Sequence, residues 1–418
     1  MKKYWIIFFF LNCAYTFSQS TTLEECQKAA RENSSYLKQI KQIKRVSNLD
    51  EKSYNANYLP QFSLEGLASY QSETFSFPIK VPNLSIPEVA KDQYQLFLTI
   101  NQVIYDGGAI AKGKDIANAV SELNSLSSEA KLYKTKELVN SLYFSILILK
   151  ENKNKLSLAL GTLEANLKQI NSLVQNGALL KSAADAIQVE IIKLKQNLDA
   201  LEKDIESNIE VLEILTGLHD LSSKEFLLPS LSERYSDINR PEVKALEMQA
   251  EVQSKNKDLI YSSLLPKFFF FAKAGYASPN ALNFLEEDFT SFYILGLKMA
   301  WNPFDWGTNQ RKREIADINR QNIAFDREEL LKNINSSIIK EKSEIAKYSK
   351  IIDDDMKIIE IQSQIVKEKF SLLKNGAITS AEYVNDFNAL LQYEINLETH
   401  RILLANSKIN LLTKTGNF

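Results

Sequence analysis

The sequence has few of the residues that build metal sites, disulfide frameworks or catalytic loops. Its 418 residues include only two cysteines and two histidines, too few for a convincing metal site or a disulfide framework. No GxGxxG, GxxxxGK(S/T), HExxH or GxSxG pattern occurs, so we expect neither an enzyme nor a bound cofactor. The formal net charge of −2 comes without a basic block, which argues against nucleic acid as a partner.

The N-terminus has the pattern of an export signal. Two lysines precede a short apolar stretch, residues 4–11, and Thr16 and Ser18 are the small residues that a signal peptidase accepts. We therefore predict a cleaved signal peptide over residues 1–18. A membrane anchor is disfavoured because a spanning helix needs about 20 apolar residues. Cys13 leaves a lipidated N-terminus open as an alternative.

No later apolar run approaches membrane-spanning length, so the mature chain is expected either to be soluble in the periplasm or to insert as a β-barrel. An internal repeat favours the second option. The motif Tyr-Asp-Gly-Gly at Asp106 returns as Phe-Asp-Trp-Gly at Asp305, an offset of 305 − 106 = 199 residues. Leu-Val-Gln-Asn-Gly-Ala at Gly177 returns as Leu-Leu-Lys-Asn-Gly-Ala at Gly376, and 376 − 177 is again 199. Two unrelated motifs at one offset indicate tandem copies of one structural unit.

Each copy contains two strands that alternate apolar and polar residues. We expect strands at about 61–71 and 94–105 in the first copy and at about 267–277 and 290–302 in the second. One apolar face per strand is what a lipid-facing barrel requires, although a half-buried soluble sheet fits any single strand equally well. The residues predicted to face lipid are Phe62, Leu64, Phe268, Phe270, Leu295 and Leu297.

A very long helix follows each pair of strands. Heptad series of apolar residues predict helices over 108–174 and 307–374, and 67 residues at about 1.5 Å each give roughly 100 Å. Asn-Gly pairs end both helices, and return helices are expected over 182–218 and 380–413. The strand-to-helix turns are Asp106, Gly108, Asp305 and Gly307.

The predicted organisation is a first repeat over 19–218, an irregular connector over 219–239 and a second repeat over 240–418. Each repeat opens with a helix before its strands, residues 22–57 in the first copy. The fold class is therefore mostly α, with long coiled-coil helices and four strands in each chain.

In the order and twofold spacing of these motifs, the chain resembles the TolC-like outer-membrane efflux and secretion channels. The resemblance extends to the opening segments Thr22–Asn33 and Arg240–Val243. It implies a homotrimer in the cell outer membrane, with a 12-stranded β-barrel surrounded by outer-membrane lipid and a large periplasmic α-barrel. It also implies an exit duct for a tripartite efflux or type I secretion system, engaged by a periplasmic adaptor and an inner-membrane pump.

The resemblance also assigns residues. The adaptor-docking tips would be Asn176, Gly177, Ala178, Asn375, Gly376 and Ala377. An acidic ring that narrows the periplasmic end in the family would fall on Glu382 and Asn385, and Asp386 lies next to them as a further gate candidate. Here an amide replaces one of the two family acids, which weakens the ring. An exported coiled-coil scaffold or adhesin remains the alternative, and the transported substrate stays open.

Overall fold

The computed structural model describes residues 20–74, 89–229, 237–283, 286 and 288–417. The predicted signal peptide, with Cys13, lies outside the described residues. In chain order the elements are β1 (Ser20–Thr21), α1 (Leu23–Asn33), α2 (Ser35–Ala56), β2 (Gln61–Tyr70), β3 (Asp92–Tyr105), α3 (Ala109–Gln175), α4 (Lys181–Thr216), a short 3-10 helix η1 (Leu221–Ser223), β4 (Glu225–Phe226), α5 (Pro241–Ser262), β5 (Lys267–Ser278), β6 (Thr290–Ala300), α6 (Thr308–Lys374) and α7 (Ser380–Thr415).

The chain packs into two compact units, and neither coincides with one copy of the repeat. Unit 1 takes its described residues from Met1–Lys38, Ser128–Pro241 and Leu331–Phe418, and unit 2 comprises Gln39–Ser127 and Glu242–Leu330. Each unit therefore combines segments of both copies. Elements of one copy pack against elements of the other, β3 against β5 and α4 against α7, which the sequence repeat alone does not reveal.

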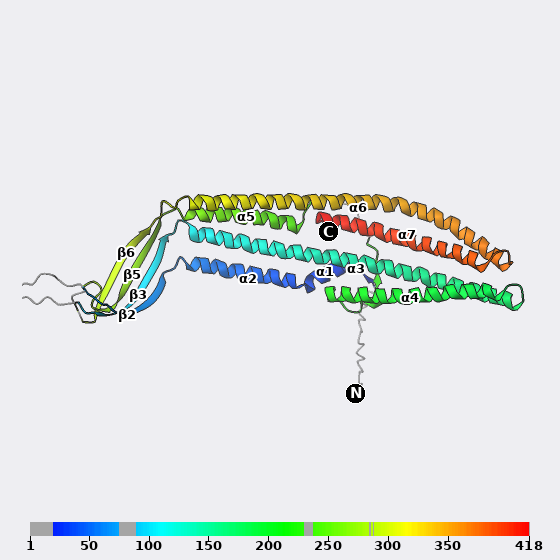
Figure 1. Ribbon diagram of the computed structural model, residues 1–418, viewed down its shortest axis with the longest axis horizontal. Helices are drawn as coiled ribbons and strands as arrows, with labels where there is room; N and C mark the ends of the chain where they lie inside the picture. The colour runs from blue at the N-terminus through cyan, green and yellow to red at the C-terminus, as the bar shows by residue number, and fades with distance from the viewer. Residues whose placement is uncertain (1–19, 75–88, 230–236, 284–285, 287, 418) are drawn as a thin grey trace, which may run out of the picture. The chain divides into compact units, whose positions relative to one another are not determined.

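Unit 2 contains one four-stranded antiparallel sheet in the order β2-β3-β5-β6 (Figure 1). The central pair joins the two copies, with Leu98 opposite Ala274. Because side chains alternate between faces, the register also decides which residues share a face. A bulge between Val103 and Tyr105 ends the regular pairing of β3 with β5 where β3 approaches α3.

The helices of unit 2 are joined by close packing and ion pairs. A Cβ added to Gly113 of α3 would lie 2.7 Å from Cε1 of Tyr54, so α2 and α3 approach closely at this glycine. In the second copy, Lys257 of α5 lies 2.5 Å from Asp317 of α6. The long helix of each copy is therefore held against the shorter helix that precedes its strands.

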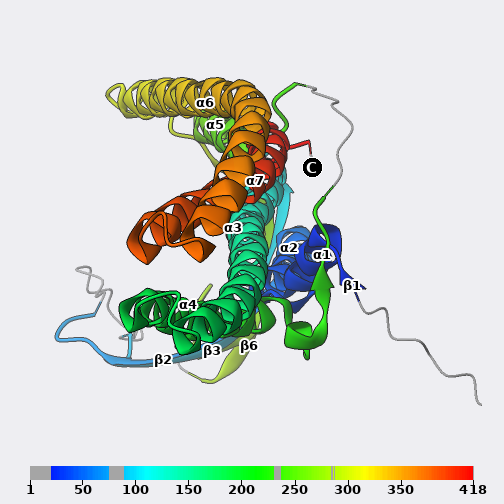
Figure 2. The ribbon, with the colours of Figure 1, turned by 90° about the vertical axis from the view of Figure 1, so that its right-hand side faces the viewer.

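Unit 1 contains two helical hairpins, one from each copy. Figures 1 and 2 show α4 running back beside α3 and α7 running back beside α6. Near the turns of the hairpins, buried side chains from all four helices form one core, for example Leu163, Ile187, Leu373 and Tyr383. The heptad spacing of the sequence is therefore satisfied by helices of both copies.

A second core in unit 1 surrounds Tyr143 of α3. The Tyr143 hydroxyl lies 2.9 and 2.8 Å from the carbonyl oxygens of Thr21 and Leu227, and these two acceptors share its single proton. Thr21 is the last residue of β1, and Leu227 follows β4, which pairs with β1 in parallel. The expected irregular connector therefore contains a short helix and a strand in its described part, 219–229 and 237–239, because Tyr143 and the β1 backbone provide hydrogen-bond partners for it.

The predicted opening helix over 22–57 is interrupted. Helix α1 ends at Asn33, and Ser34 has an extended backbone with φ −66° and ψ 134°. The Asn33 side chain donates hydrogen bonds to the carbonyl oxygens of Ile214 and Leu215, both at 3.3 Å. This tertiary contact at the C-terminal end of α4 accompanies the break, so the prediction of one continuous helix was wrong.

Within the described residues, none of the helices is both long enough and apolar enough to cross a membrane. In the same part of the chain, no group of three or more His, Cys, Asp or Glu side chains is arranged to hold a metal ion.

Candidate functional site

The two strand-to-helix turns have the same hydrogen-bond pattern. The Asp106 carboxylate accepts hydrogen bonds from the backbone nitrogens of Gly108 and Ile110, at 2.8 and 2.6 Å. Asp305 accepts from Gly307 and Asn309 at 3.0 and 2.7 Å. Both aspartates therefore satisfy free N–H groups at the start of a 67-residue helix, where negative charge is favourable.

The turns differ at the residue after the aspartate, which has a positive φ in both copies. A Cβ on Gly107 would lie 2.6 Å from the carbonyl oxygen of Ser262, so the first copy has space only for glycine. Trp306 occupies the matching position with φ 55° and is 80% exposed, packing edge to face on Phe304. Both copies share the aspartate and the glycine two positions later, Gly108 or Gly307, because these residues make the turn. The residue between them differs because its surroundings differ.

The two Asn-Gly tips also match. Gly177 and Gly376 have φ of 73° and 70°, and the next residues, Ala178 and Ala377, donate to the carbonyl oxygens five positions earlier at 2.9 and 3.0 Å. This is the Schellman end of a helix, which favours glycine because of its left-handed backbone. The six tip residues predicted from the sequence are all exposed.

A groove of about 580 Å³ lies between the two tips. Its apolar lining comes from both hairpins and includes Leu179, Ala183, Leu373 and Ile378. Leu180 beside it is 78% exposed. An open apolar groove with exposed aliphatic side chains at its rim is suited to a helical partner.

The acidic gate candidates lie beside a lysine that sequence reasoning missed. Lys369 of α6 is 3.7 Å from the Asp386 carboxylate and 4.0 Å from that of Glu382. Asn385 is exposed. In a helical hairpin, residues equally far from the turn face each other. Lys369 lies 376 − 369 = 7 residues before Gly376, and Glu382 lies 382 − 376 = 6 residues after it. This spacing could have predicted that Lys369 lies beside Glu382.

A buried hydrogen bond joins the two hairpins near the same end. The Asn166 side chain of α3 donates to the Tyr383 hydroxyl of α7 at 2.6 Å, and Tyr383 is only 1% exposed. Burial raises the pKa of Tyr383 to about 12. Asn166 and Tyr383 thus form a polar contact inside an apolar core. The heptad pattern of the sequence did not predict this contact.

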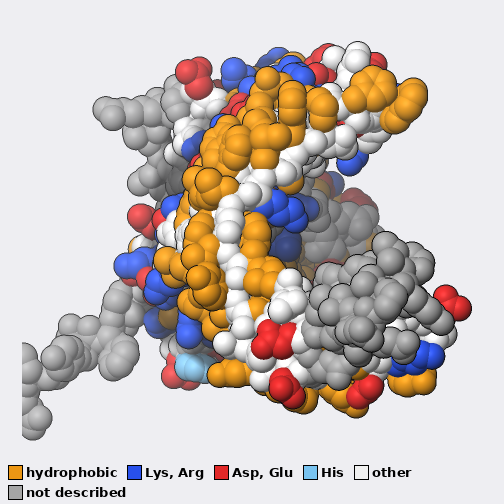
Figure 3. Space-filling view, turned by 90° about the vertical axis from the view of Figure 1, so that its left-hand side faces the viewer, with side chains coloured by type: hydrophobic (Ala, Val, Ile, Leu, Met, Phe, Trp, Pro, Cys, Tyr) orange, Lys and Arg blue, Asp and Glu red, His pale blue; other side chains and the backbone are white. Residues whose placement is uncertain are grey.

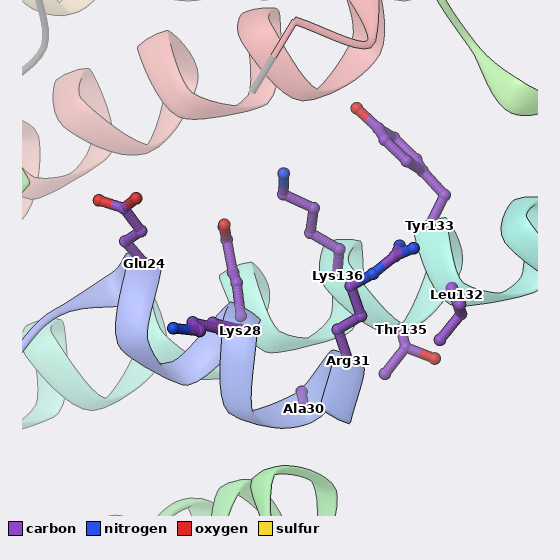
Figure 4. A pocket seen from close by; sticks show the side chains of 9 residues that line it. Glu24, Lys28, Ala30, Arg31, Leu132, Tyr133, Thr135 and Lys136 are labelled. Carbon is purple, nitrogen blue, oxygen red and sulfur yellow. The ribbon is translucent and has the colours of Figure 1, made fainter. Parts of the chain in front are cut away.

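A pocket of about 520 Å³ lies between α1 and α3 in unit 1 (Figure 4). Glu24 and Arg31 from α1 and Tyr133 and Lys136 from α3 line it. Arg31 is held by Glu129 at 2.6 Å. Burial, with a smaller effect of the Arg31 charge, lowers the pKa of Lys136 to about 8.

The sheet register places the six residues predicted to face lipid on one face. Phe270 pairs with Leu297, and through β3 this face continues to Leu64. Leu297 is 76% exposed and Leu64 is 70% exposed. Phe62, Phe268 and Leu295 are also exposed, and Phe270 is half-buried. In the view that faces the strands, hydrophobic side chains form a nearly continuous band (Figure 3). The packing of unit 2 leaves this apolar face uncovered.

No protein-family model and no curated protein matches the chain. Solved structures do match, including three bacterial outer-membrane proteins. The Campylobacter jejuni outer membrane channel CmeC has a TM-score of 0.71 at 14% identity, over 94% of this chain and 85% of that one. The Vibrio cholerae outer membrane protein VceC has 0.73 at 14%, over 94% and 96%. The open-state Neisseria gonorrhoeae outer membrane channel MtrE has 0.70 at 14%, over 94% and 88%. The chain therefore has the fold of the TolC-like outer-membrane channels.

Proposed function

We propose that the protein is a passive channel of the cell outer membrane, and that three copies assemble into an exit duct. The exposed apolar face of the sheet carries this proposal. Its side chains are in register across four strands, and a surface of this kind is unfavourable in water but matches the hydrocarbon of a bilayer. Solved channels of the same fold support the reading.

The edges of the sheet support assembly. Strands β2 and β6 pair on one side only among the described strands, and an unpaired strand edge is not tolerated in lipid. The three pairings are antiparallel, so β6 of one copy set beside β2 of the next would again be antiparallel. Three copies with four strands each would close a barrel of 3 × 4 = 12 strands.

The hairpin tips support a partner outside the membrane. The groove between them has an apolar lining, and the tips Asn176–Ala178 and Asn375–Ala377 are exposed on either side of it. We assign them to docking of a periplasmic adaptor, which would link the channel to an inner-membrane pump for efflux or type I secretion. Efflux and type I secretion would use the same channel architecture. The pump would therefore select the transported substrate.

We assign the charged cluster of Lys369, Glu382 and Asp386 to the gate that narrows the channel at its periplasmic end. Glu382 and Asp386 bring two negative charges and Lys369 one positive charge per copy, a net −1. Around a threefold axis such charges would attract cations. In planar bilayers, Glu382→Gln with Asp386→Asn should reduce cation preference and block by a trivalent cation. Unchanged selectivity and block would remove these residues from the gate and leave the channel proposal standing.

The proposal is tested by extraction, mass and conductance together. A membrane channel requires detergent for extraction, has the mass of three chains in detergent and conducts ions in planar bilayers. An exported coiled-coil scaffold or adhesin would dissolve in salt and would not conduct. A stable monomer in mild detergent would refute the trimer, and release by salt alone would refute membrane insertion.

A further inference from the structure

The face of the sheet opposite the apolar face carries an unusual set of charges. It holds three lysines, Lys267, Lys273 and Lys298, and a single carboxylate, Glu65. The register places them together, because Lys298 pairs with Phe269, Lys273 pairs with Thr99, and Thr99 pairs with Ser63 two residues from Glu65. This lysine face therefore has a net charge of 3 − 1 = +2 in each chain.

Aromatic rings lie among these charges. Phe97 and Phe292 are 9% and 5% exposed and form a small core with Ala277. The Lys273 ammonium lies 3.3 Å from the centroid of the Phe97 ring and 5.8 Å from that of Phe292. The ammonium is thus held against two ring faces, an arrangement that orients a cation without neutralising it.

Two glycines of the same face allow neighbouring groups to approach the sheet closely. A Cβ at Gly275 would lie 2.1 Å from the carbonyl oxygen of Leu96 and 2.6 Å from Cα of Phe97. At Gly296 it would lie 2.7 Å from Cε1 of the Phe271 ring. Glycine in a strand interior weakens the strand and marks close approach of another group. Here the approaching groups are the β3 backbone at Gly275 and the Phe271 ring at Gly296, so glycine at position 296 leaves room for a ring on the lysine face.

We infer that the lysine face is a binding surface for aromatic organic anions, the class of molecule that joins a ring to a carboxylate or sulfonate. The half-buried rings of Phe269 and Phe271 lie between Lys267 and Lys273 on this face of β5, and Phe269 pairs with Lys298, so one ligand would stack on these rings while its anionic group meets a lysine. Organic cations are disfavoured by the net positive charge. The inference rests on the proposed function, in which this face lines the channel interior, and it names the substrate class that the sheet end accepts.

The surface differs from an ordinary barrel interior, which is polar and filled with water. The lysines alone would be enough to attract small anions by their charge. The half-buried rings of Phe269 and Phe271 add apolar area that benefits a ligand with a ring of its own. The discriminating property is therefore the requirement for both parts, the ring and the negative charge.

Isothermal titration calorimetry on the full chain in detergent tests the inference without requiring an open channel. Naphthalene-2-sulfonate should bind saturably. Methanesulfonate, which lacks the ring, and 2-naphthylmethylammonium, which has the opposite charge, should bind far more weakly. Lys273→Gln should weaken naphthalene-2-sulfonate binding about tenfold, the usual effect of losing one charge-assisted hydrogen bond.

Two further variants keep the result interpretable. Lys298→Gln removes an exposed charge of the same face and should also weaken binding, even where Lys273→Gln fails to assemble. Lys203→Gln, in an exposed ion pair with Glu206 on α4, should leave binding unchanged. Absence of saturable binding, equal binding of the naphthyl cation, or equal affinity in all three variants would overturn the inference.

Planar-bilayer conductance separates this inference from the proposed function. If the protein conducts but naphthalene-2-sulfonate neither binds nor blocks, the surface assignment is wrong and the channel stands. If the chain binds the sulfonate with the expected lysine dependence but forms no trimer and no pore, the channel proposal is wrong and the binding surface stands.

Discussion

The sharpest prediction concerns two adjacent residues of β6 that point to opposite faces of the sheet. Leu297 is 76% exposed and lies on the apolar face between Leu295 and Met299, opposite Phe270 on β5. Lys298 lies on the lysine face. Leu297→Arg places a charge among apolar side chains, whereas Lys298→Glu exchanges one charge for another on a face that already holds charges.

The expected magnitudes differ because lipid and water solvate charge differently. An arginine on the lipid face near the bilayer midplane costs about 2–4 kcal/mol. No carboxylate of the described residues pairs with β6 at this level of the sheet, so the arginine has no partner that would reduce this cost. At about 1.4 kcal/mol per factor of ten, each site shifts the insertion equilibrium by roughly 30- to 1,000-fold. Three copies in a trimer carry about 6–12 kcal/mol in total.

The assay is the yield of assembled trimer in the outer-membrane fraction, measured by mass in mild detergent and followed by urea unfolding. Leu297→Arg should strongly reduce trimer, and Lys298→Glu should remain close to the unchanged protein. Equal yields would show that the apolar face does not contact lipid. The reverse order would show that the two faces are exchanged, which a register error of one residue would produce.

Three predictions concern stability and are measured by denaturant unfolding. Gly107→Ala should cost about 2–4 kcal/mol because its Cβ meets backbone at 2.6 Å, whereas Gly108→Ala, with free space around it, should cost about 1–2 kcal/mol; equal costs would refute the steric argument. Tyr383→Phe should cost about 1–3 kcal/mol because Asn166 loses its buried partner, and an unchanged midpoint would show that Asn166 finds another. Lys136→Met should stabilise the protein by about 1–3 kcal/mol at pH 7, because the pKa of Lys136 is about 8 folded against 10.5 unfolded. This gain should decline as the pH rises from 8 to 10.5, and a gain independent of pH would contradict the linkage.

Local patterns in the sequence predicted the features that depend on residues close together in the chain. Strand alternation gave the face that carries Phe62, Leu64 and Leu297, and the register shows these residues on one face. The glycines at positions 177 and 376 ended the long helices as expected, because a left-handed helix end favours glycine wherever it occurs. The turn aspartates were identified by spacing, and the structure shows how each accepts two backbone hydrogen bonds. The roles of Glu382, Asn385 and Asp386 and of the tips in docking stay predictions.

Contacts between distant residues were not readable in the same way. The break at Ser34 accompanies a side-chain contact from Asn33 to α4, and the β1–β4 pairing involves segments about 200 residues apart. Lys369 reaches the acidic candidates only because a hairpin brings it there. The first two depend on a partner that no local pattern specifies, whereas the distances of Lys369 and Glu382 from the turn at Gly376 could have indicated the third.

The sequence alone determined the type and order of the four long strands and the four longest helices, because helix and strand periodicity and the 199-residue offset are local or repetitive properties. Tertiary structure decided how the two copies combine. It joined β3 to β5 across the copies, divided the chain into two units that each draw on both copies, and gathered Lys273, Phe97 and Phe292 on one face. The physical reason is that pairing of strands and packing of rings depend on which surfaces remain unburied after local structure has formed, and that choice is made between segments far apart in the chain.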